Sequence, residues 1–271
     1  MNTKSVLLLL VVFFFVFASC KDDNENTNDI TIDNQMEQLV YPIPTPFETT
    51  QMLQEAGAAY IGGLTNDVNS VDNYFKEKSQ ALNLGIFGAD LAYASTYNQA
   101  QSIREIMVAS KKLSDQLGLT TVIDQSLVER VERNIDNGDT LYKIVNNTYY
   151  DTFNKLNNEN KGAVSIMVIA GAWIESIYIS TQLAATSTDK SILSQKIAEQ
   201  KYTVNTLVPL IEQYKTDNAD IAELELVIVR FKDFFDKIIA NEDGEVTMDD
   251  AMLEELMTIA KDEREKIISM Q

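Results

Sequence analysis

Apolar residues are distributed in two ways along this chain. From Ala163 to Ala185 they form a continuous run with a single charged residue, Glu175, near its middle. In most of the other segments they recur every three or four residues among polar positions, which is the pattern of an amphipathic helix. A helix that is apolar on all sides either is buried in a protein core or spans a membrane, and this run is long enough for both.

The charge and the flanks of this run favour a buried helix over a membrane span. Glu175 would lie near the centre of the bilayer, where a charged residue costs roughly 2.5–3.5 kcal/mol on insertion scales. No cluster of lysine or arginine follows the run, which continues into threonine and serine. We therefore expect a central helix near 163–185, with the other helices packed around it.

Capping signals divide the rest of the chain into further helices. Thr45, Pro46 and Glu48 form a capping box with proline at the first helical position, and Asp124 can cap another apolar-periodic segment. No segment has the clear alternation of a strand. The expected helices cover about 46–56, 71–82, 83–118, 125–135, 140–158, 191–214, 219–240 and 248–270. With the central helix they predict an all-α, antiparallel bundle of about eight or nine helices in a single domain, 45–271.

Three residues are unusual inside these predicted helices: Gly85, Gly88 and Pro209. Glycine costs a helix about 1 kcal/mol relative to alanine, so the two glycines require an explanation. No strand precedes them, which argues against a nucleotide-binding fingerprint. We expect both glycines to permit close packing between helices, and we expect Pro209 to kink its helix.

The N-terminal residues have the features of a bacterial lipoprotein. Lys4 supplies a positive charge, residues 6–17 are apolar, and small residues precede Cys20, which resembles a lipobox. Residues 1–19 are then a signal peptide, and Cys20 becomes a mature N-terminus that carries diacylglycerol and an amide-linked acyl chain. The alternative is an ordinary cleaved signal followed by an unmodified cysteine. Residues 20–44 are polar and acidic, which predicts a flexible tether.

Composition excludes several classes of function. The formal net charge is −19, which argues against nucleic acid and anionic lipid as partners. The chain has no histidine and only one cysteine, so Ser-His-Asp catalysis and His-ligated metal sites are excluded. Residues 239–250 resemble a calcium loop only weakly, because Ile239 at the first ligand position cannot coordinate. We expect no metal and no cofactor.

Two of the predicted helices carry an acidic residue in an apolar setting. Residues 90–96 and 175–181 share the pattern acid-x-x-Tyr-x-Ser-Thr. Positions three or four apart lie on one face of a helix, so each acid shares a face with its tyrosine. If the two helices face each other, two carboxylates and several tyrosine hydroxyls converge. The candidate ligand-binding residues are Asp90, Tyr93, Tyr97, Trp173, Glu175 and Tyr178.

Three interpretations of these residues remain open. The first is a satisfied core network in which tyrosine hydroxyls and Arg104 bond the acids. The second is a site for a small ligand or a cation. The third is glycoside hydrolysis by paired carboxylates, although no glycosidase signature is visible. A pocket connected to solvent favours the second interpretation, and a sealed, hydrogen-bonded network favours the first.

Several stretches resemble one family. PIPTPFETTQ, ALNLGIFGADLAYAS and AGAWIESIYIS are similar to segments of uncharacterised Bacteroidota lipoproteins, and Lys21 followed by acidic residues resembles the surface-export signal of Bacteroidota lipoproteins. The resemblance implies an outer-membrane location and a helical domain, but no activity. We expect a lipoprotein that faces the cell exterior and binds a small ligand, a glycan or a protein partner. The first alternative is an accessory subunit of an envelope complex without a ligand pocket, and the second is a histidine-free carboxylate enzyme acting on glycans.

Overall fold

The computed structural model describes residues 43–271, and every regular element within them is a helix. The predicted all-α bundle is therefore confirmed. The predicted signal peptide, Cys20 and nearly all of the tether lie outside the described residues. The elements are α2 (Pro46–Glu55), the 3₁₀ helix η1 (Val68–Asn73), α3 (Glu77–Thr96), α4 (Ala100–Gln116), α5 (Gln125–Arg133), α6 (Gly138–Asn158), α7 (Gly162–Thr186), α8 (Ser191–Ala198), α9 (Gln200–Glu212), α10 (Ala219–Phe235) and α11 (Asp250–Ile268).

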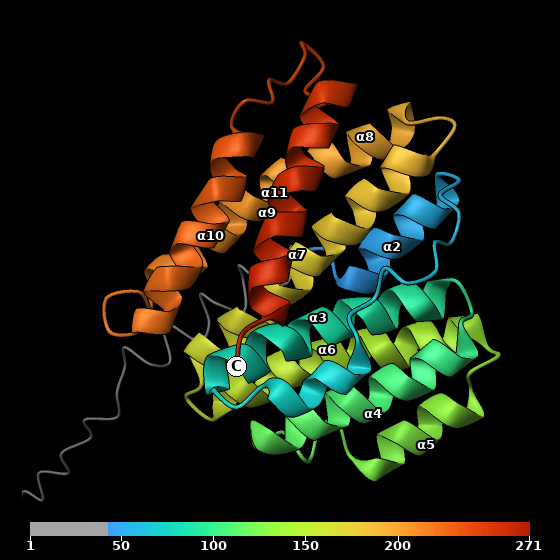
Figure 1. Cartoon of the computed structure of the whole chain (residues 1–271), viewed down its shortest axis with the longest axis vertical. Helices are drawn as coiled ribbons and strands as arrows, with labels where there is room; N and C mark the ends of the chain where they lie inside the picture. The colour runs from blue at the N-terminus through green and yellow to red at the C-terminus, as the bar shows by residue number, and fades with distance from the viewer. Residues whose placement is uncertain (1–42) are drawn as a thin grey trace, which may run out of the picture.

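The central helix is α7. It runs between the green helices α3–α6 and the orange-to-red helices α8–α11 (Figure 1). By length and composition α7 resembles a membrane span, but 89% of its most apolar stretch is buried inside the bundle. Its side chains belong to one continuous hydrophobic core that extends from Ile43 to Ile267. The prediction of a buried central helix is confirmed.

Glycine lets α3 and α7 approach closely. A Cβ atom on Gly85 would lie 2.1 Å from the backbone oxygen of Val168, and one on Gly171 would lie 2.1 Å from the backbone oxygen of Leu82. Each helix therefore presents a glycine to the backbone of the other. The prediction for Gly85 is confirmed. For Gly88 it is wrong, because a Cβ there would have no described heavy atom within 4 Å.

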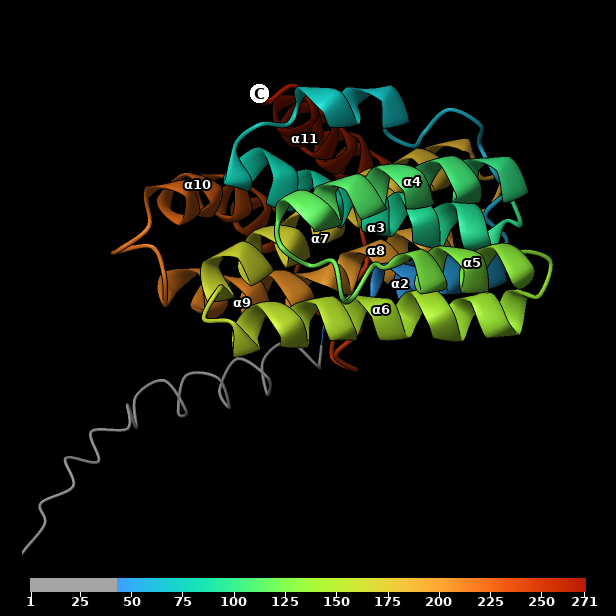
Figure 2. The same cartoon turned by 90° about the horizontal axis from the view of Figure 1, so that it is seen from below.

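The contacts between α3 and α7 also show the relative direction of the two helices. Leu82 lies against Gly171, and further along both chains Asp90 contacts Glu175. The helices α3 and α7 are therefore parallel. This differs from the predicted bundle, in which short connections between helices would make neighbouring helices antiparallel. Seen from below, α4, α5 and α6 lie in front of this pair (Figure 2). This arrangement places the middle of α3 and of α7 deep inside the bundle.

Several predicted boundaries differ from the observed ones, and the largest differences are in the segments 71–118 and 191–214. The segments 71–82 and 83–118 are replaced by η1, α3 and α4, and α3 passes through both of its glycines without a break. The chain instead leaves the helix at Asn98, whose φ of 54° lies in the left-handed region. The segment 191–214 is interrupted at Glu199, and Pro209 lies inside α9. Packing against α7 explains the continuity of α3, since buried contacts outweigh the weak helix propensity of glycine.

Candidate functional site

The structure brings the two acids of the repeated pattern together. Asp90 on α3 and Glu175 on α7 are both 0% exposed, and their carboxyl groups lie close enough to influence each other's pKa. The close approach of the two helices at their glycines makes this contact possible. The two helices therefore face each other, so the condition on which the convergence of the two carboxyl groups depended is met.

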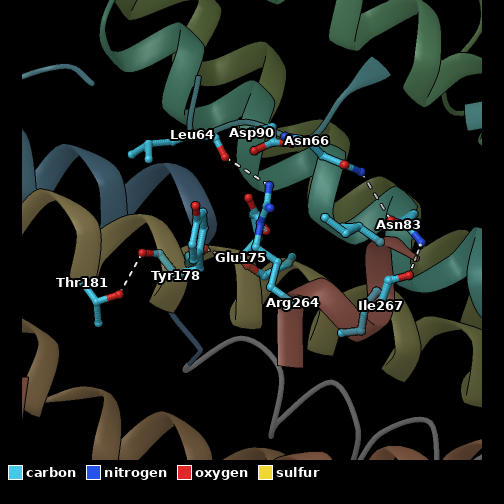
Figure 3. Close-up of polar contacts among 12 residues, drawn as sticks. Leu64, Asn66, Asn83, Asp90, Glu175, Tyr178, Thr181, Arg264 and Ile267 are labelled. Atoms are coloured by element: carbon cyan, nitrogen blue, oxygen red, sulfur yellow. Dashed lines mark hydrogen bonds and ion pairs between the residues drawn. The ribbon is translucent and has the colours of Figure 1, made fainter. Parts of the chain in front are cut away.

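The partner of these acids is Arg264 on α11. Its Nε donates to Glu175 Oε2 at 2.6 Å, and its Nη2 donates to the backbone oxygen of Leu64 at 3.1 Å. The guanidinium carbon lies 4.3 Å from the ring centroid of Tyr178. Figure 3 shows Arg264 among Glu175, Asp90 and Leu64. The prediction that Arg104 pairs with the acids is wrong, because Arg104 forms a surface ion pair with Glu132.

One proton makes this cluster neutral. Asp90 Oδ2 accepts from the Asn66 N–H at 2.9 Å, whereas Asp90 Oδ1 and Glu175 Oε1 find no donor among the described N–H and O–H groups. Burial and the charge of Glu175 raise the pKa of Asp90 well above its usual range. Burial also raises the pKa of Glu175, but Arg264 opposes that shift. We therefore expect Asp90 to hold a proton that it can donate to Glu175, whereas Glu175 and Arg264 form an ion pair.

Asp90→Asn should change how stability depends on pH. An acid whose pKa is higher in the folded state than in the unfolded state binds more protons when the protein is folded. Its contribution to the free energy of unfolding therefore falls as the pH rises from about 3.9, the unfolded pKa, through the raised folded pKa. Asparagine keeps an acceptor for Asn66 and a donor for Glu175 but does not titrate. The free energy of unfolding of the wild type minus that of the variant should therefore fall with pH, by at most about 1.4 kcal/mol per unit.

Urea denaturation of both proteins across this pH range measures that difference. Subtracting the variant removes the contribution of the other titrating groups, such as Asp124 and Glu159, whose pKa values hydrogen bonds lower. A difference that stays constant with pH would show that Asp90 does not take up a proton on folding.

The tyrosines of α3 bind a loop and do not face the acids. The Tyr93 hydroxyl accepts from the Ile61 N–H at 2.7 Å and donates to the Ile61 oxygen at 3.0 Å. The Tyr97 hydroxyl donates to the Ala58 oxygen at 2.7 Å, and burial raises its pKa to about 12. Together with the bonds from Asp90 and Arg264, these contacts fix the backbone of loop 58–66. Buried backbone groups need hydrogen-bond partners, and the side chains of Tyr93, Tyr97, Asp90 and Arg264 supply them for this loop.

Trp173 lies in another cluster. Its Nε1 donates to Gln200 Oε1 at 3.0 Å, and its ring packs edge-on against Phe231 with centroids 5.1 Å apart. Of the six candidate residues, the structure therefore joins Asp90, Glu175 and, through Arg264, Tyr178. It separates Tyr93, Tyr97 and Trp173 from the carboxyl pair.

Sequence reasoning missed Arg264, although a signal for it exists. Every third or fourth residue of α11 is buried, and this stripe includes one arginine and one glutamate. An arginine on the buried face of a helix needs an acidic partner. The stripe consists of Leu253, Leu256, Ile259, Ala260, Glu263, Arg264 and Ile267.

The arrangement does not suit catalysis or metal binding. Neither carboxyl group reaches solvent, and Glu175 is already paired with Arg264. Within residues 43–271, no group of three or more acidic or cysteine side chains is placed to hold a metal ion. The carboxyl pair therefore fits a buried core network, as in the first interpretation, but its partners are Arg264 and the Asn66 N–H and not tyrosine hydroxyls and Arg104.

A hollow space exists elsewhere in the bundle. A narrow cavity of about 60 Å³ lies between α2, α3, α4, α5, α6 and α7, and apolar side chains line most of it. None of the six candidate residues is among the described residues that line it. We call this space the α3–α6 cavity.

Comparison of the chain with protein-family models, with curated proteins and with solved structures finds no match, so its function has to be inferred from its own residues and their arrangement.

Proposed function

We propose that this chain is an outer-membrane lipoprotein, anchored through Cys20, whose helical domain binds a ligand outside the membrane and catalyses no reaction. The observation that carries the binding role is the α3–α6 cavity, an apolar space inside an otherwise closely packed bundle. The sealed and neutral Asp90–Glu175–Arg264 cluster supports the absence of catalysis, because a carboxyl group that cannot reach a substrate cannot act on it.

The proposed location rests on the N-terminal sequence. The apolar segment before Cys20 and the small residues beside it resemble a lipoprotein signal, and an acidic stretch follows Lys21 as in surface-exported lipoproteins. Several acyl chains on one residue anchor a protein firmly, unlike a single chain. The resemblance to uncharacterised Bacteroidota lipoproteins supports the same location.

A second candidate function is an accessory subunit of an envelope complex that holds no ligand. The sealing of Asp90 and Glu175 favours it, because the residues that looked most like a binding site stabilise the fold instead. The two candidates differ in what the purified chain does alone. A binding module takes up a ligand without a partner protein, whereas an accessory subunit does not.

Cys20→Ala is expected to move the protein from the membrane fraction to the soluble fraction, because the alanine cannot carry the acyl chains. Fractionation followed by immunoblotting measures this change. As a matched control, replacing Asp22 and Asp23 with asparagine keeps Cys20 and should leave the protein in the membrane while lowering its digestion by protease added to intact cells. A Cys20→Ala chain that remains in the membrane would contradict the proposed anchor.

A further inference from the structure

We propose that the α3–α6 cavity binds an uncharged, slender aliphatic molecule that carries one hydroxyl or amide group. This inference rests on the proposed binding function and specifies the class of ligand. Four features of the cavity support it: a missing side chain, unpaired polar atoms, an uncharged lining and a narrow shape.

The missing side chain is that of Gly88. Gly85, one turn earlier on α3, must be glycine because a Cβ atom would collide with α7. Gly88 has no such requirement, since a Cβ atom there would meet no described heavy atom within 4 Å. Its φ is not in the left-handed region, so backbone strain does not explain it either. Glycine at this position weakens the helix and leaves an empty space beside it. A ligand that occupies this space explains why the position is glycine despite that cost.

The unpaired polar atoms are Ser110 Oγ on α4 and Asn146 Oδ1 on α6. Both residues line the cavity, and neither atom finds a hydrogen-bond partner among the described residues. Ser110 is only 4% exposed, so its hydroxyl cannot turn to bulk solvent. Two other lining residues behave differently: Thr148 and Thr152 donate to backbone oxygens four residues earlier, at 2.8 and 2.7 Å.

Unpaired buried polar atoms indicate what the ligand must offer. A buried donor or acceptor without a partner costs free energy, and a bound group that pairs with it recovers that cost. A hydroxyl or an amide can donate to Asn146 and also pair with Ser110. Asn146 and Gly88 both line the cavity and are both half-buried, so the polar end of a ligand can pair with Asn146 while its aliphatic part fills the space beside Gly88.

The lining and the shape exclude other classes of ligand. Among the described residues that line the cavity none is charged, so a carboxylate or an ammonium group would be buried without a counter-charge. The cavity contacts six helices although its volume is only about 60 Å³, which indicates a slot and not a round pocket. A smaller hollow of about 10 Å³ shares Tyr149, Thr152 and Val168 with it and reaches Ser165, whose Oγ is also unpaired. An unbranched chain fits such a slot.

An NMR titration with n-propanol, which is small enough for a cavity of about 60 Å³, tests the inference on the chain from residue 21 onward, which retains the whole core. We expect saturable binding at one site. Gly88→Leu should fill the slot and weaken binding at least tenfold, whereas Gly138→Leu should leave it unchanged. Gly138 is a matched control because it is also helical and also has open space at its Cβ, but does not line the cavity. Ser110→Ala should weaken binding roughly 2- to 12-fold, the equivalent of one hydrogen bond.

Propionate, the charged counterpart of n-propanol, distinguishes a wrong ligand class from a wrong site. If propionate binds and n-propanol does not, the cavity is a binding site but the inferred ligand class is wrong. If neither binds to the folded wild type, the cavity is not a site for aliphatic ligands and the binding function loses its main support. Binding of n-propanol that is unchanged in Gly88→Leu would overturn the assignment to this cavity. Circular dichroism spectra and urea denaturation of each variant verify that it is folded.

Discussion

Replacing Arg264 with methionine is expected to lower the free energy of unfolding by about 3–5 kcal/mol at neutral pH. The change removes the only positive charge that contacts Glu175 among the described residues, at a position where Glu175 is 0% exposed. It also removes the hydrogen bond to the Leu64 oxygen and the contact with the Tyr178 ring. Urea denaturation followed by circular dichroism measures the loss.

Arg104→Met is the matched control for this change. Arg104 pairs with Glu132 on the surface, with side chains that are 43% and 51% exposed, so the same substitution there should cost no more than about 1 kcal/mol. Adding Glu175→Gln to Arg264→Met should recover much of the loss, because the buried group is then neutral. A double variant as unstable as Arg264→Met would show that the lost ion pair is not the cause.

Gly85→Ala is expected to destabilise the protein by about 1–3 kcal/mol or more, because a Cβ atom would lie 2.1 Å from the Val168 oxygen and 2.7 Å from the Ala172 nitrogen. Both are backbone atoms, so relief requires α3 and α7 to move apart as whole helices. The same glycine-to-alanine change at Gly88 meets no atom and should stabilise the protein by about 0.5–1 kcal/mol. Thermal or urea unfolding of the two variants gives the comparison.

The two substitutions should change the free energy of unfolding in opposite directions. Both substitutions remove a helical glycine from α3, so their effect on helix propensity is the same. Only the contact with α7 differs. Equal effects of Gly85→Ala and Gly88→Ala would contradict the close approach of the two helices.

Much of the fold follows from local patterns in the sequence. The apolar run near 163–185 predicts the buried helix, and the caps at Thr45 and Asp124 mark two helix starts that the structure confirms. The repeated acid-x-x-Tyr pattern predicts that Asp90 and Glu175 are related. The apolar run and the caps depend on residues within a few turns of each other, and the repeated pattern is visible because the same local sequence occurs twice.

The partners of the site residues could not be predicted in the same way. Arg264 is 89 residues from Glu175, and its choice over Arg104 depends on how α11 packs against α7. The partners of Tyr93 and Tyr97 are backbone groups of loop 58–66, which carry no sequence signature. In a sequence, polar residues on one face of a helix form the same pattern whether their side chains bind a ligand or the backbone of a loop.

The two glycines of α3 illustrate the same limit for function. In the sequence Gly85 and Gly88 are equivalent, and both were expected to permit helix packing. Only the surroundings of each Cβ position show that Gly85 maintains a contact and Gly88 leaves a space. The candidate binding site therefore emerges from the packing of six helices around a missing side chain, and not from a motif.

The central claim is that the paired acids form a sealed, neutral network and not a reactive site. Infrared spectroscopy of the carboxyl stretching region tests it most directly, on the wild type and on Asp90→Asn at neutral pH. Exposed carboxyl groups are ionised there, so a buried protonated one stands out. The structure predicts a carboxylic acid band in the wild type that is absent in Asp90→Asn. Identical spectra without that band would show that Asp90 and Glu175 are both ionised, and would contradict the claim.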